Sequence, residues 1–265
     1  MLKVTVVGCG WLGYPLALSF IEKGYSVLGT TTTKEKVTDL QGKGVIARFW
    51  KISDCIIKED VSFLEKMDVL IVNIPPSKVD TTFEYSTVLE NLVQHLSKTI
   101  KIIFISTTSV YPDDLKIADE KYTWTKQDTR KQTVLAEIKL SNYLKNRLTI
   151  LRFSGLVGPN RHPVKFLAGK IDVSNGNASV NLIHLNDAVG LINTIIETNY
   201  WGEIINGCFP IHPKRNEYYT KAADFYKLSR PIFSPDVVCS KIVSSSKSEL
   251  ELNYIYKFPI TNFDE

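Results

Sequence analysis

From residue 3 onward the chain reads Lys3-Val4-Thr5-Val6-Val7-Gly8-Cys9-Gly10-Trp11-Leu12-Gly13. The residues before Gly8 are mostly apolar and β-branched, which predicts a short buried strand. Behind the glycines, Pro15 is tolerated in a first helical turn, and Gly24 suits the end of a helix. The sequence therefore predicts a strand, a tight glycine turn and a helix in one continuous unit, with the glycines spaced Gly-x-Gly-x-x-Gly.

The three glycines of this turn have different expected tasks. Gly8 permits the tight turn, Gly10 lets the backbone approach a pyrophosphate, and Gly13 lets the helix lie close to the strand. The N-terminus of the helix adds N–H groups and the positive end of a dipole. This arrangement is typical of dinucleotide-binding Rossmann folds and predicts a nicotinamide cofactor. The predicted cofactor contacts are Gly8, Gly10, Trp11, Leu12, Gly13, Thr30, Thr31, Lys34, Ile74, Pro75 and Phe153.

The end of the second expected strand bears on which cofactor binds. An NAD site usually places Asp or Glu there, about 20 residues after the glycines, to bind the ribose 2′-hydroxyl. Here the chain reads Gly29-Thr30-Thr31-Thr32-Thr33-Lys34, and the first acidic residue is Glu35. Threonine hydroxyls together with Lys34 or Lys36 suit a 2′-phosphate, so NADP(H) is favoured over NAD(H). The alternative is that these threonines only turn the chain and Lys34 lies in solvent.

Apolar β-branched runs alternate with longer amphipathic segments, which predicts a parallel sheet with crossover helices. Strands are expected at 3–7, 25–30, 45–49, 69–73, 101–106, 149–153, 180–185 and 203–207, and helices at 83–96, 129–144, 187–197 and 216–228. The predicted fold class is α/β, a Rossmann doubly wound parallel sheet with a small C-terminal substrate lobe. Residues 1–160 would form the NAD(P)-binding core, and residues 161–265 would add further strands, helices and the lobe, in a single compact unit.

Composition excludes several classes of function. The chain has 32 basic and 28 acidic residues without a dense run of Lys or Arg, so no nucleic-acid partner is expected. No stretch approaches the roughly 20 apolar residues of a membrane span, and no signal peptide is visible, so a cytoplasmic location is expected. Cys9, Cys55, Cys208 and Cys239 form no CxxC pair, which indicates reduced thiols and no metal site. The expected partner is a small-molecule substrate, and an oligomer stays open.

Three further stretches carry a resemblance to a known family. They read Ile105-Ser106-Thr107-Thr108-Ser109-Val110-Tyr111, Leu151-Arg152-Phe153-Ser154-Gly155-Leu156-Val157-Gly158-Pro159 and Ile183-His184-Leu185-Asn186-Asp187-Ala188. Together with the glycine turn they resemble extended short-chain dehydrogenases/reductases, the NAD-dependent epimerase/dehydratase group, and within it small atypical members of the YeeZ type. The resemblance implies an NAD(P)-dependent oxidoreductase or epimerase.

A second family shares fewer features. The glycine turn followed by Ile74-Pro75-Pro76 is also similar to β-hydroxyacid dehydrogenases, which continue into a long all-helical domain. The strands expected here near Thr149 and Val180 disfavour that family, because they return the chain to a sheet.

The resemblance implies a Ser or Thr after the fifth strand, a Tyr as acid/base and a Lys four residues later on the same helix face. Thr107 matches the first position, where it could instead cap the strand. The Tyr and Lys are missing from the expected stretch 130–134. The pair Tyr122 and Lys126 has the right spacing but lies in an expected loop, and Tyr111 is a further candidate acid whose alternative role is core packing.

Basic residues after the sixth strand suggest where a substrate binds. Arg161, His162 and Lys165, joined by Arg215, could bind an anionic group such as a phosphate or carboxylate. The alternatives are a turn shaped by His162 and solvated basic side chains. We therefore expect a small polar or anionic substrate, sugar-derived ones included. The competing hypotheses are a non-catalytic dinucleotide-binding or sensor protein that has lost the Tyr–Lys pair, and a partner-binding protein on a degenerate scaffold.

Overall fold

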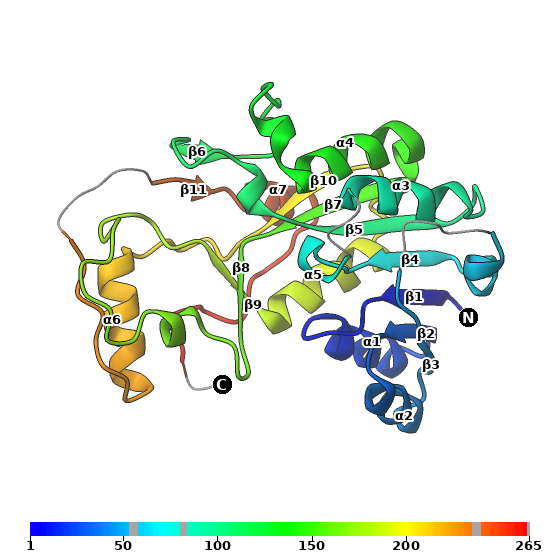
Figure 1. The fold of residues 1–265 in the computed structure, drawn as a ribbon, viewed down its shortest axis with the longest axis horizontal. Coiled ribbons are helices and arrows are strands. Elements are labelled where there is room, and N and C mark those ends of the chain that lie inside the picture. Colours follow the sequence, from blue (N-terminus) through cyan, green and yellow to red (C-terminus); the bar gives the residue numbers. More distant parts are fainter. Residues whose placement is uncertain (53–57, 80–83, 235–239, 264–265) are drawn as a thin grey trace. The chain divides into compact units, whose positions relative to one another are not determined.

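A seven-stranded sheet with the strand order β10-β7-β5-β4-β1-β2-β3 is the centre of the fold in the computed structural model (Figure 1). The model describes residues 1–52, 58–79, 84–234 and 240–263. Its strands are β1 (Lys3–Val7), β2 (Ser26–Thr31), β3 (Ile46–Phe49), β4 (Val69–Val72), β5 (Lys101–Thr107), β7 (Leu148–Phe153) and β10 (Ile204–Gly207). Strand β1 pairs in parallel with β2 and β4, β2 with β3, and β4 with β5. The predicted α/β doubly wound Rossmann fold is confirmed.

The helices are α1 (Gly13–Glu22), α2 (Lys34–Gly42), α3 (Tyr85–Gln94), α4 (Gln132–Leu144), α5 (Leu185–Glu197), α6 (Arg215–Phe225) and α7 (Ser246–Glu251). Figure 1 shows α3 and α4 above the strands β1 to β4 and α2 below them, with α1 beside β2 and β3. Two short parallel pairs complete the secondary structure: β6 (Ile117–Ala118) with β11 (Ile242–Val243), and β8 (Gly155–Val157) with β9 (Leu182–His184).

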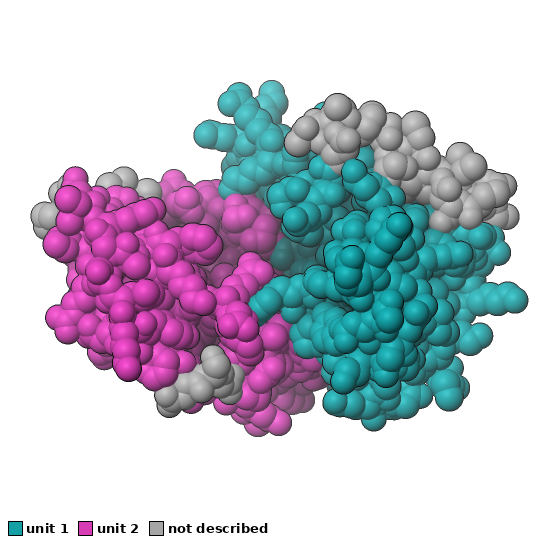
Figure 2. Space-filling view, turned by 60° about the horizontal axis from the view of Figure 1, so that its bottom comes forward, with its two compact units in different colours: residues 1–106, 124–151, 195–204 teal, residues 107–123, 152–194, 205–265 magenta. Residues whose placement is uncertain are grey.

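The chain folds as two units that interleave along the sequence. Unit 1 comprises residues 1–106, 124–151 and 195–204, and unit 2 comprises residues 107–123, 152–194 and 205–265 (Figure 2). The sequence predicts a core over residues 1–160 and further elements over residues 161–265 within a single compact unit, and this division stays a prediction. The chain leaves unit 1 within each of the strands β5, β7 and β10. The strand pattern continues through these points, so composition carries no signal of the transitions.

Each unit has its own apolar core. In unit 1, side chains of the sheet such as Leu70 and Phe104 pack against Leu89 of α3 and Leu140 of α4. Burial of these apolar side chains from water is the main favourable contribution to folding. In unit 2, a second cluster joins β8 and β9 to α6, and it is rich in aromatic residues. The aromatic members of that cluster are Phe209, Tyr218, Tyr219, Tyr226, Phe233, Tyr256 and Phe263.

Most expected elements occur within a few residues of their predicted bounds, but two local expectations are wrong. The helix expected from residue 129 begins at Gln132, and its N-cap is Lys131 without a side-chain hydrogen bond. Residues Asp128–Arg130 form a short 3-10 turn instead, in which the carboxylate of Asp128 accepts hydrogen bonds of 2.8 Å from the backbone and the hydroxyl of Thr125. Helix α7 begins at Ser246, where the sequence predicts no helix.

Candidate functional site

The glycine turn between β1 and α1 leaves one face open. A Cβ at Gly8 would collide with the backbone oxygen of Asn73, and Gly8 has a φ of +101° that favours glycine. A Cβ at Gly13 would collide with the backbone oxygen of Gly8. A Cβ at Gly10 would meet no atom within 4 Å. The first and third glycines are therefore needed by the fold itself, whereas the second keeps a space free.

Hydrogen bonds from two neighbouring strands fix this turn. The side-chain amide of Asn73, directly after β4, donates to the oxygen of Gly8 at 2.9 Å. On the other side, the Thr30 hydroxyl accepts from the Gly8 N–H at 3.1 Å, and the Cys9 N–H donates to the Thr30 oxygen at 2.7 Å. Asn73 was missed by the sequence reasoning. Its signal is a polar residue directly behind a fully buried strand, at the edge where parallel strands end.

The N-terminus of α1 has the features of an anion site. Leu12 is the N-cap and provides no side-chain hydrogen bond, and the first turn contains no acidic residue. Backbone N–H groups at such a terminus carry the positive end of the helix dipole. Trp11 is partly exposed and Leu12 is buried. The backbone of the turn is therefore accessible to a ligand beside Gly10. A phosphate could therefore approach the helix end without displacing a carboxylate.

Cys9 fills space within the turn. Its thiol is buried, lies 3.6 Å from the oxygen of Val6, and would clash with a Cβ at Gly29. Burial raises the pKa of the Cys9 thiol to about 12. Such a thiol stays protonated and is a poor nucleophile, which agrees with its interpretation as a space filler. Cys208 is likewise buried, while Cys55 and Cys239 lie outside the described residues.

The end of β2 uses its first two threonines inside the protein. Thr30 holds the glycine turn, as above, and the Thr31 hydroxyl accepts from the N–H of Thr33 at 3.2 Å. Both residues are buried, whereas Thr32, Thr33 and Lys34 are exposed. Helix α2 begins at Lys34, and no side chain caps it. Of the predicted contacts at this strand end, Lys34 is therefore exposed, whereas the hydroxyls of Thr30 and Thr31 are used inside the protein.

Two further predicted cofactor contacts lie beside the glycine turn. Ile74 follows Asn73 and is partly buried, and its Cγ1 would lie 3.5 Å from a Cβ at Gly8. The hydroxyl of Tyr85 donates to the oxygen of Ile74 at 2.7 Å and so fixes the backbone before the exposed Pro75. Phe153 belongs to unit 2, where it is buried and its ring lies against Gly207.

Thr107 has the predicted position at the end of β5. Its hydroxyl oxygen accepts a hydrogen bond from the N–H of Ser109 at 3.2 Å and caps the short 3-10 turn Thr108–Val110. The alternative capping role is therefore present. It does not use the hydroxyl hydrogen, which a threonine can donate while it accepts.

Tyr111 is a core residue of unit 2. Its ring is 1% exposed, and its hydroxyl accepts from Arg152 at 2.8 Å and donates to the Asn206 side chain at 2.9 Å. The Arg152 guanidinium also lies 4.9 Å from the ring centroid. Burial raises the pKa of Tyr111, although the nearby Arg152 opposes this effect. Among the two roles considered for Tyr111, these contacts favour core packing over proton transfer.

The Tyr122–Lys126 pair lacks the helix that its spacing requires. Residues 122–125 have no regular secondary structure, and Lys126 lies in an exposed turn. The i, i+4 rule therefore does not bring the two groups together. Helix α4 supplies neither residue in its first turn. Its buried polar group is Glu137, which accepts a hydrogen bond from the hydroxyl of Ser106 at 2.5 Å.

His162 packs inside the aromatic cluster of unit 2. One ring nitrogen lies 2.9 Å from the hydroxyl of Tyr218, and the other accepts from the N–H of Val164 at 3.2 Å. Its ring stacks on Tyr218 and touches Tyr226. Burial lowers the pKa of His162 to about 4. Both nitrogens thus have partners within the unit, which favours the structural role of His162 over the predicted substrate role.

The other predicted substrate residues come from two segments of unit 2. Arg161 and Lys165 are exposed on either side of the buried His162. Arg215, at the start of α6, donates to the oxygen of Ser174 at 3.4 Å and lies 5.9 Å from the ring centroid of Tyr219. Their role in anion binding stays a prediction.

Residues 3–125 match the family model described as the NAD binding domain of 6-phosphogluconate dehydrogenase. Over 98% of this chain and 97% of the relative, the sequence is 35% identical to the protein YeeZ of Escherichia coli strain K12. The chain belongs to the YeeZ family. Beyond residue 125 it returns to the strands β7 and β10, so the all-helical second half of the competing family is absent from the described residues.

Solved structures share the fold of this YeeZ-family chain at low identity. They include a UDP-glucuronic acid 4-epimerase of Bacillus cereus in complex with NAD (TM-score 0.72, 18% identity, covering 98% of this chain and 95% of that one). A UDP-N-acetylglucosamine 4-epimerase of Bacillus cereus has a TM-score of 0.75 at 16% identity, with 98% and 96% covered. A dTDP-glucose 4,6-dehydratase of Bacillus anthracis in complex with NAD has a TM-score of 0.75 at 15% identity, with 98% and 93% covered.

No group of three or more His, Cys, Asp or Glu side chains has the arrangement of a metal site within the described ranges. None of the described helices combines the length and apolar character that crossing a membrane requires.

Proposed function

We propose that this YeeZ-family chain binds a nicotinamide dinucleotide on the turn Gly8–Gly13. The observation that carries the proposal is the open space at Gly10, beside the N-terminus of α1 that no side chain caps. A pyrophosphate needs close backbone approach and N–H donors, and this turn offers both. The match of residues 3–125 to an NAD-binding domain model supports the proposal.

NADP(H) is the preferred form in this proposal. No acidic side chain stands at the end of β2 to accept a hydrogen bond from a ribose 2′-hydroxyl, and the first one is Glu35 inside α2. Thr32, Thr33 and Lys34 are exposed beside the start of α2, where a 2′-phosphate would meet a positive charge and a helix N-terminus.

The proposed reaction is that of an atypical extended short-chain dehydrogenase/reductase, an NAD(P)-dependent oxidation, reduction or epimerisation. The bound nicotinamide would supply the hydride chemistry. Thr107 would donate its hydroxyl hydrogen to an oxygen of a small polar or anionic substrate, of which sugar-derived molecules are one class. The epimerases and dehydratase that share the fold act on nucleotide sugars by their names, which supports this substrate class.

A second candidate function is dinucleotide binding without turnover. Two observations on the tyrosines support it. Tyr111 is buried, and its hydroxyl already accepts one hydrogen bond and donates another. Tyr122 does not share a helix with Lys126. Loss of a general acid/base typically lowers a rate by about 10²–10⁴-fold, which would leave little or no turnover in a chain without the Tyr–Lys pair.

Calorimetric titration of Gly10→Ala tests the binding site. The added methyl group enters the open space without a clash, so the fold should keep its stability while NADPH affinity falls by at least about tenfold, equivalent to 1.4 kcal/mol. Gly42→Ala is the matched control because a Cβ there also meets no atom within 4 Å. Equal NADPH affinity in Gly10→Ala, Gly42→Ala and the parent would refute the assignment, as would the absence of any dinucleotide binding at millimolar concentration.

Thr32→Asp tests the choice of cofactor. A carboxylate directly after β2 would repel a 2′-phosphate and accept a hydrogen bond from a 2′-hydroxyl. We expect NADPH affinity to fall by about tenfold or more, since like charges in contact cost several kcal/mol, while NADH affinity is retained or improves. Thr32→Asn, which has nearly the same shape without the charge, is the control. A parent protein that already prefers NADH would overturn the NADP(H) assignment and leave the dinucleotide site standing.

A further inference from the structure

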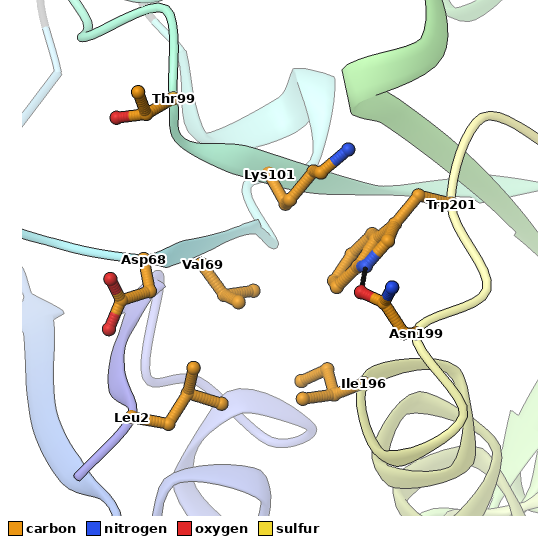
Figure 3. Close-up of a pocket in the computed structure, with 8 residues that line it drawn as sticks. All are labelled: Leu2, Asp68, Val69, Thr99, Lys101, Ile196, Asn199 and Trp201. Carbon is orange, nitrogen blue, oxygen red and sulfur yellow. Dashed lines mark hydrogen bonds between the residues drawn. The ribbon is translucent and has the colours of Figure 1, made fainter.

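A hollow in unit 1 lies at the amino ends of the strands β1, β4 and β5 (Figure 3), whereas the glycine turn follows the carboxyl end of β1. Its volume is about 230 Å³, and it opens where β1, β4 and β5 begin. Cofactor binding at the carboxyl ends of these strands leaves this hollow unused. Its lining residues are Leu2, Asp68, Val69, Thr99, Lys101, Ile196, Asn199 and Trp201.

The middle of the hollow is apolar. Figure 3 shows the side chains of Leu2, Val69 and Ile196 directed toward one another across it, with the indole of Trp201 alongside. Val69 and Ile196 are buried. The indole N–H of Trp201 donates to the side-chain oxygen of Asn199, which fixes the ring and satisfies its polar edge. A flat apolar group could therefore lie against the ring without leaving a buried N–H unpaired.

The rim carries one cation that no described residue pairs with. The Lys101 side chain is half-buried at the start of β5, and no hydrogen bond or ion pair joins its ammonium to any residue within the described ranges. Asp68 already accepts the backbone N–H of Lys3 at 2.8 Å, and the Thr99 hydroxyl lies 2.9 Å from that of Ser97. The Asp68 carboxylate keeps its negative charge, but Figure 3 shows it on the other side of the hollow from Lys101 and Trp201. Beside the indole the rim therefore presents the Lys101 ammonium, which favours an anionic head group there.

We propose that this hollow is a binding site for a small aromatic carboxylate. The aromatic ring lies between Trp201 and the apolar side chains, and the carboxylate accepts hydrogen bonds from the Lys101 ammonium. The volume is below the roughly 300–1,000 Å³ of pockets for drug-sized ligands, so the ligand has one ring and a short acid arm. The site is separate from the proposed dinucleotide site and does not depend on it.

Calorimetry and ligand-observed NMR on the full chain can test the proposal with three probes that share one ring. Phenylacetate is the anion, phenylacetamide the neutral analogue and phenethylamine the cation. We expect saturable binding in the order phenylacetate, phenylacetamide, phenethylamine. Lys101→Met, which keeps the length of the stem, should weaken phenylacetate binding by about two- to fivefold, the range of partly exposed ion pairs. Lys43→Met is the control, because it removes the same charge from an exposed position outside the hollow.

A second variant examines the ring contact. Trp201→Leu should weaken all three probes by roughly two- to tenfold, the range for aromatic pairs, with the order of the probes unchanged. Should Trp201→Leu not fold, Lys101→Met still decides the question. No saturable binding of phenylacetate, equal affinity in Lys101→Met and Lys43→Met, or tighter binding of phenethylamine would each overturn the proposal. Competition between NADPH and phenylacetate would do so too, since it would place the probe at the glycine turn.

Discussion

Single ionisable side chains in unit 2 are held by partners from distant parts of the chain. His162 contacts Tyr218, 56 residues later, and Arg152 contacts Tyr111, 41 residues earlier. A buried polar group without such partners would cost about 1–3 kcal/mol, so each contact limits which replacements the unit can tolerate. His162 and Tyr111 were candidates for chemistry in the sequence, and their partners show that they also serve the packing of the unit.

The titration of His162 leads to a prediction about pH. Its folded-state pKa of about 4 lies below the ordinary 6.5, so the unfolded chain takes up a proton between these values while the folded ring stays neutral. The contribution of His162 to the free energy of unfolding is therefore fully present above about pH 6.5, and it decreases as the pH falls toward 4. His162→Asn can still accept the Val164 N–H and should show a flatter dependence in urea unfolding across this window. Parallel curves for parent and variant would contradict the assignment.

At the scale of elements, the contact between β5 and α4 depends on one buried polar pair. Ser106 and Glu137 are 7% and 2% exposed, and the hydroxyl of the first donates to the carboxylate of the second. The same helix packs Leu140 and Leu144 against α3 and the sheet. The pair therefore fixes the end of β5, directly before Thr107, to a helix that carries no Tyr or Lys in its first turn.

Removal of this pair should destabilise the chain. Glu137→Ala leaves the Ser106 hydroxyl without its acceptor, and we expect a loss of about 1–3 kcal/mol in the free energy of unfolding. Glu137→Gln keeps an acceptor and should lose less. Glu90→Gln is the control, because the ion pair of Glu90 with Lys139 is partly exposed and contributes at most about 1 kcal/mol. A loss in Glu137→Ala no larger than in Glu90→Gln, measured by urea unfolding, would show that the pair is dispensable.

Elements with a strong apolar pattern could be predicted from the sequence, and others could not. Strand β1 occurs at its predicted residues, because four of its five side chains are buried. Helix α2 was missed because Leu40 is its single buried residue and no apolar face signals it. The short strands β6 and β11 have two residues each, too few for any periodicity. At the site, the glycines were visible as a motif, whereas the role of Asn73 depends on a fold that brings β4 beside β1.

At the scale of the whole molecule, the carboxylate of Asp187 binds the last part of the chain within unit 2. Asp187, in the first turn of α5, accepts hydrogen bonds from the backbone of Lys257 at 2.9 Å and of Phe258 at 3.0 Å, and from the hydroxyl of Tyr254 at 3.2 Å. Phe258 also stacks on His184 with 5.1 Å between ring centroids. The side chain of Asp187 is fully buried, so its charge depends on these donors.

Loss of this carboxylate should release the segment that it holds. Asp187→Ala leaves two backbone N–H groups without an acceptor. We expect amide hydrogen exchange at residues 254–258 to become faster, and by more than exchange at the glycine turn. Asp187→Asn, with one acceptor oxygen, should have an intermediate effect. Asp113→Ala, which removes an exposed carboxylate in the same unit, is the control. Unchanged protection of residues 254–258 in Asp187→Ala would show that the ring contacts alone hold the segment.

Because the two units interleave along the sequence, recombination between genes can exchange a whole unit only with difficulty. The chain passes between units at residues 106/107, 123/124, 151/152, 194/195 and 204/205. Neither unit thus corresponds to one uninterrupted stretch of gene, and a single recombination event would transfer fragments of both. New specificity in this architecture would arise through point substitutions, or through insertions in loops that stay within one unit. Transfer of unit 2 onto another dinucleotide-binding protein would require several new chain junctions at the same time.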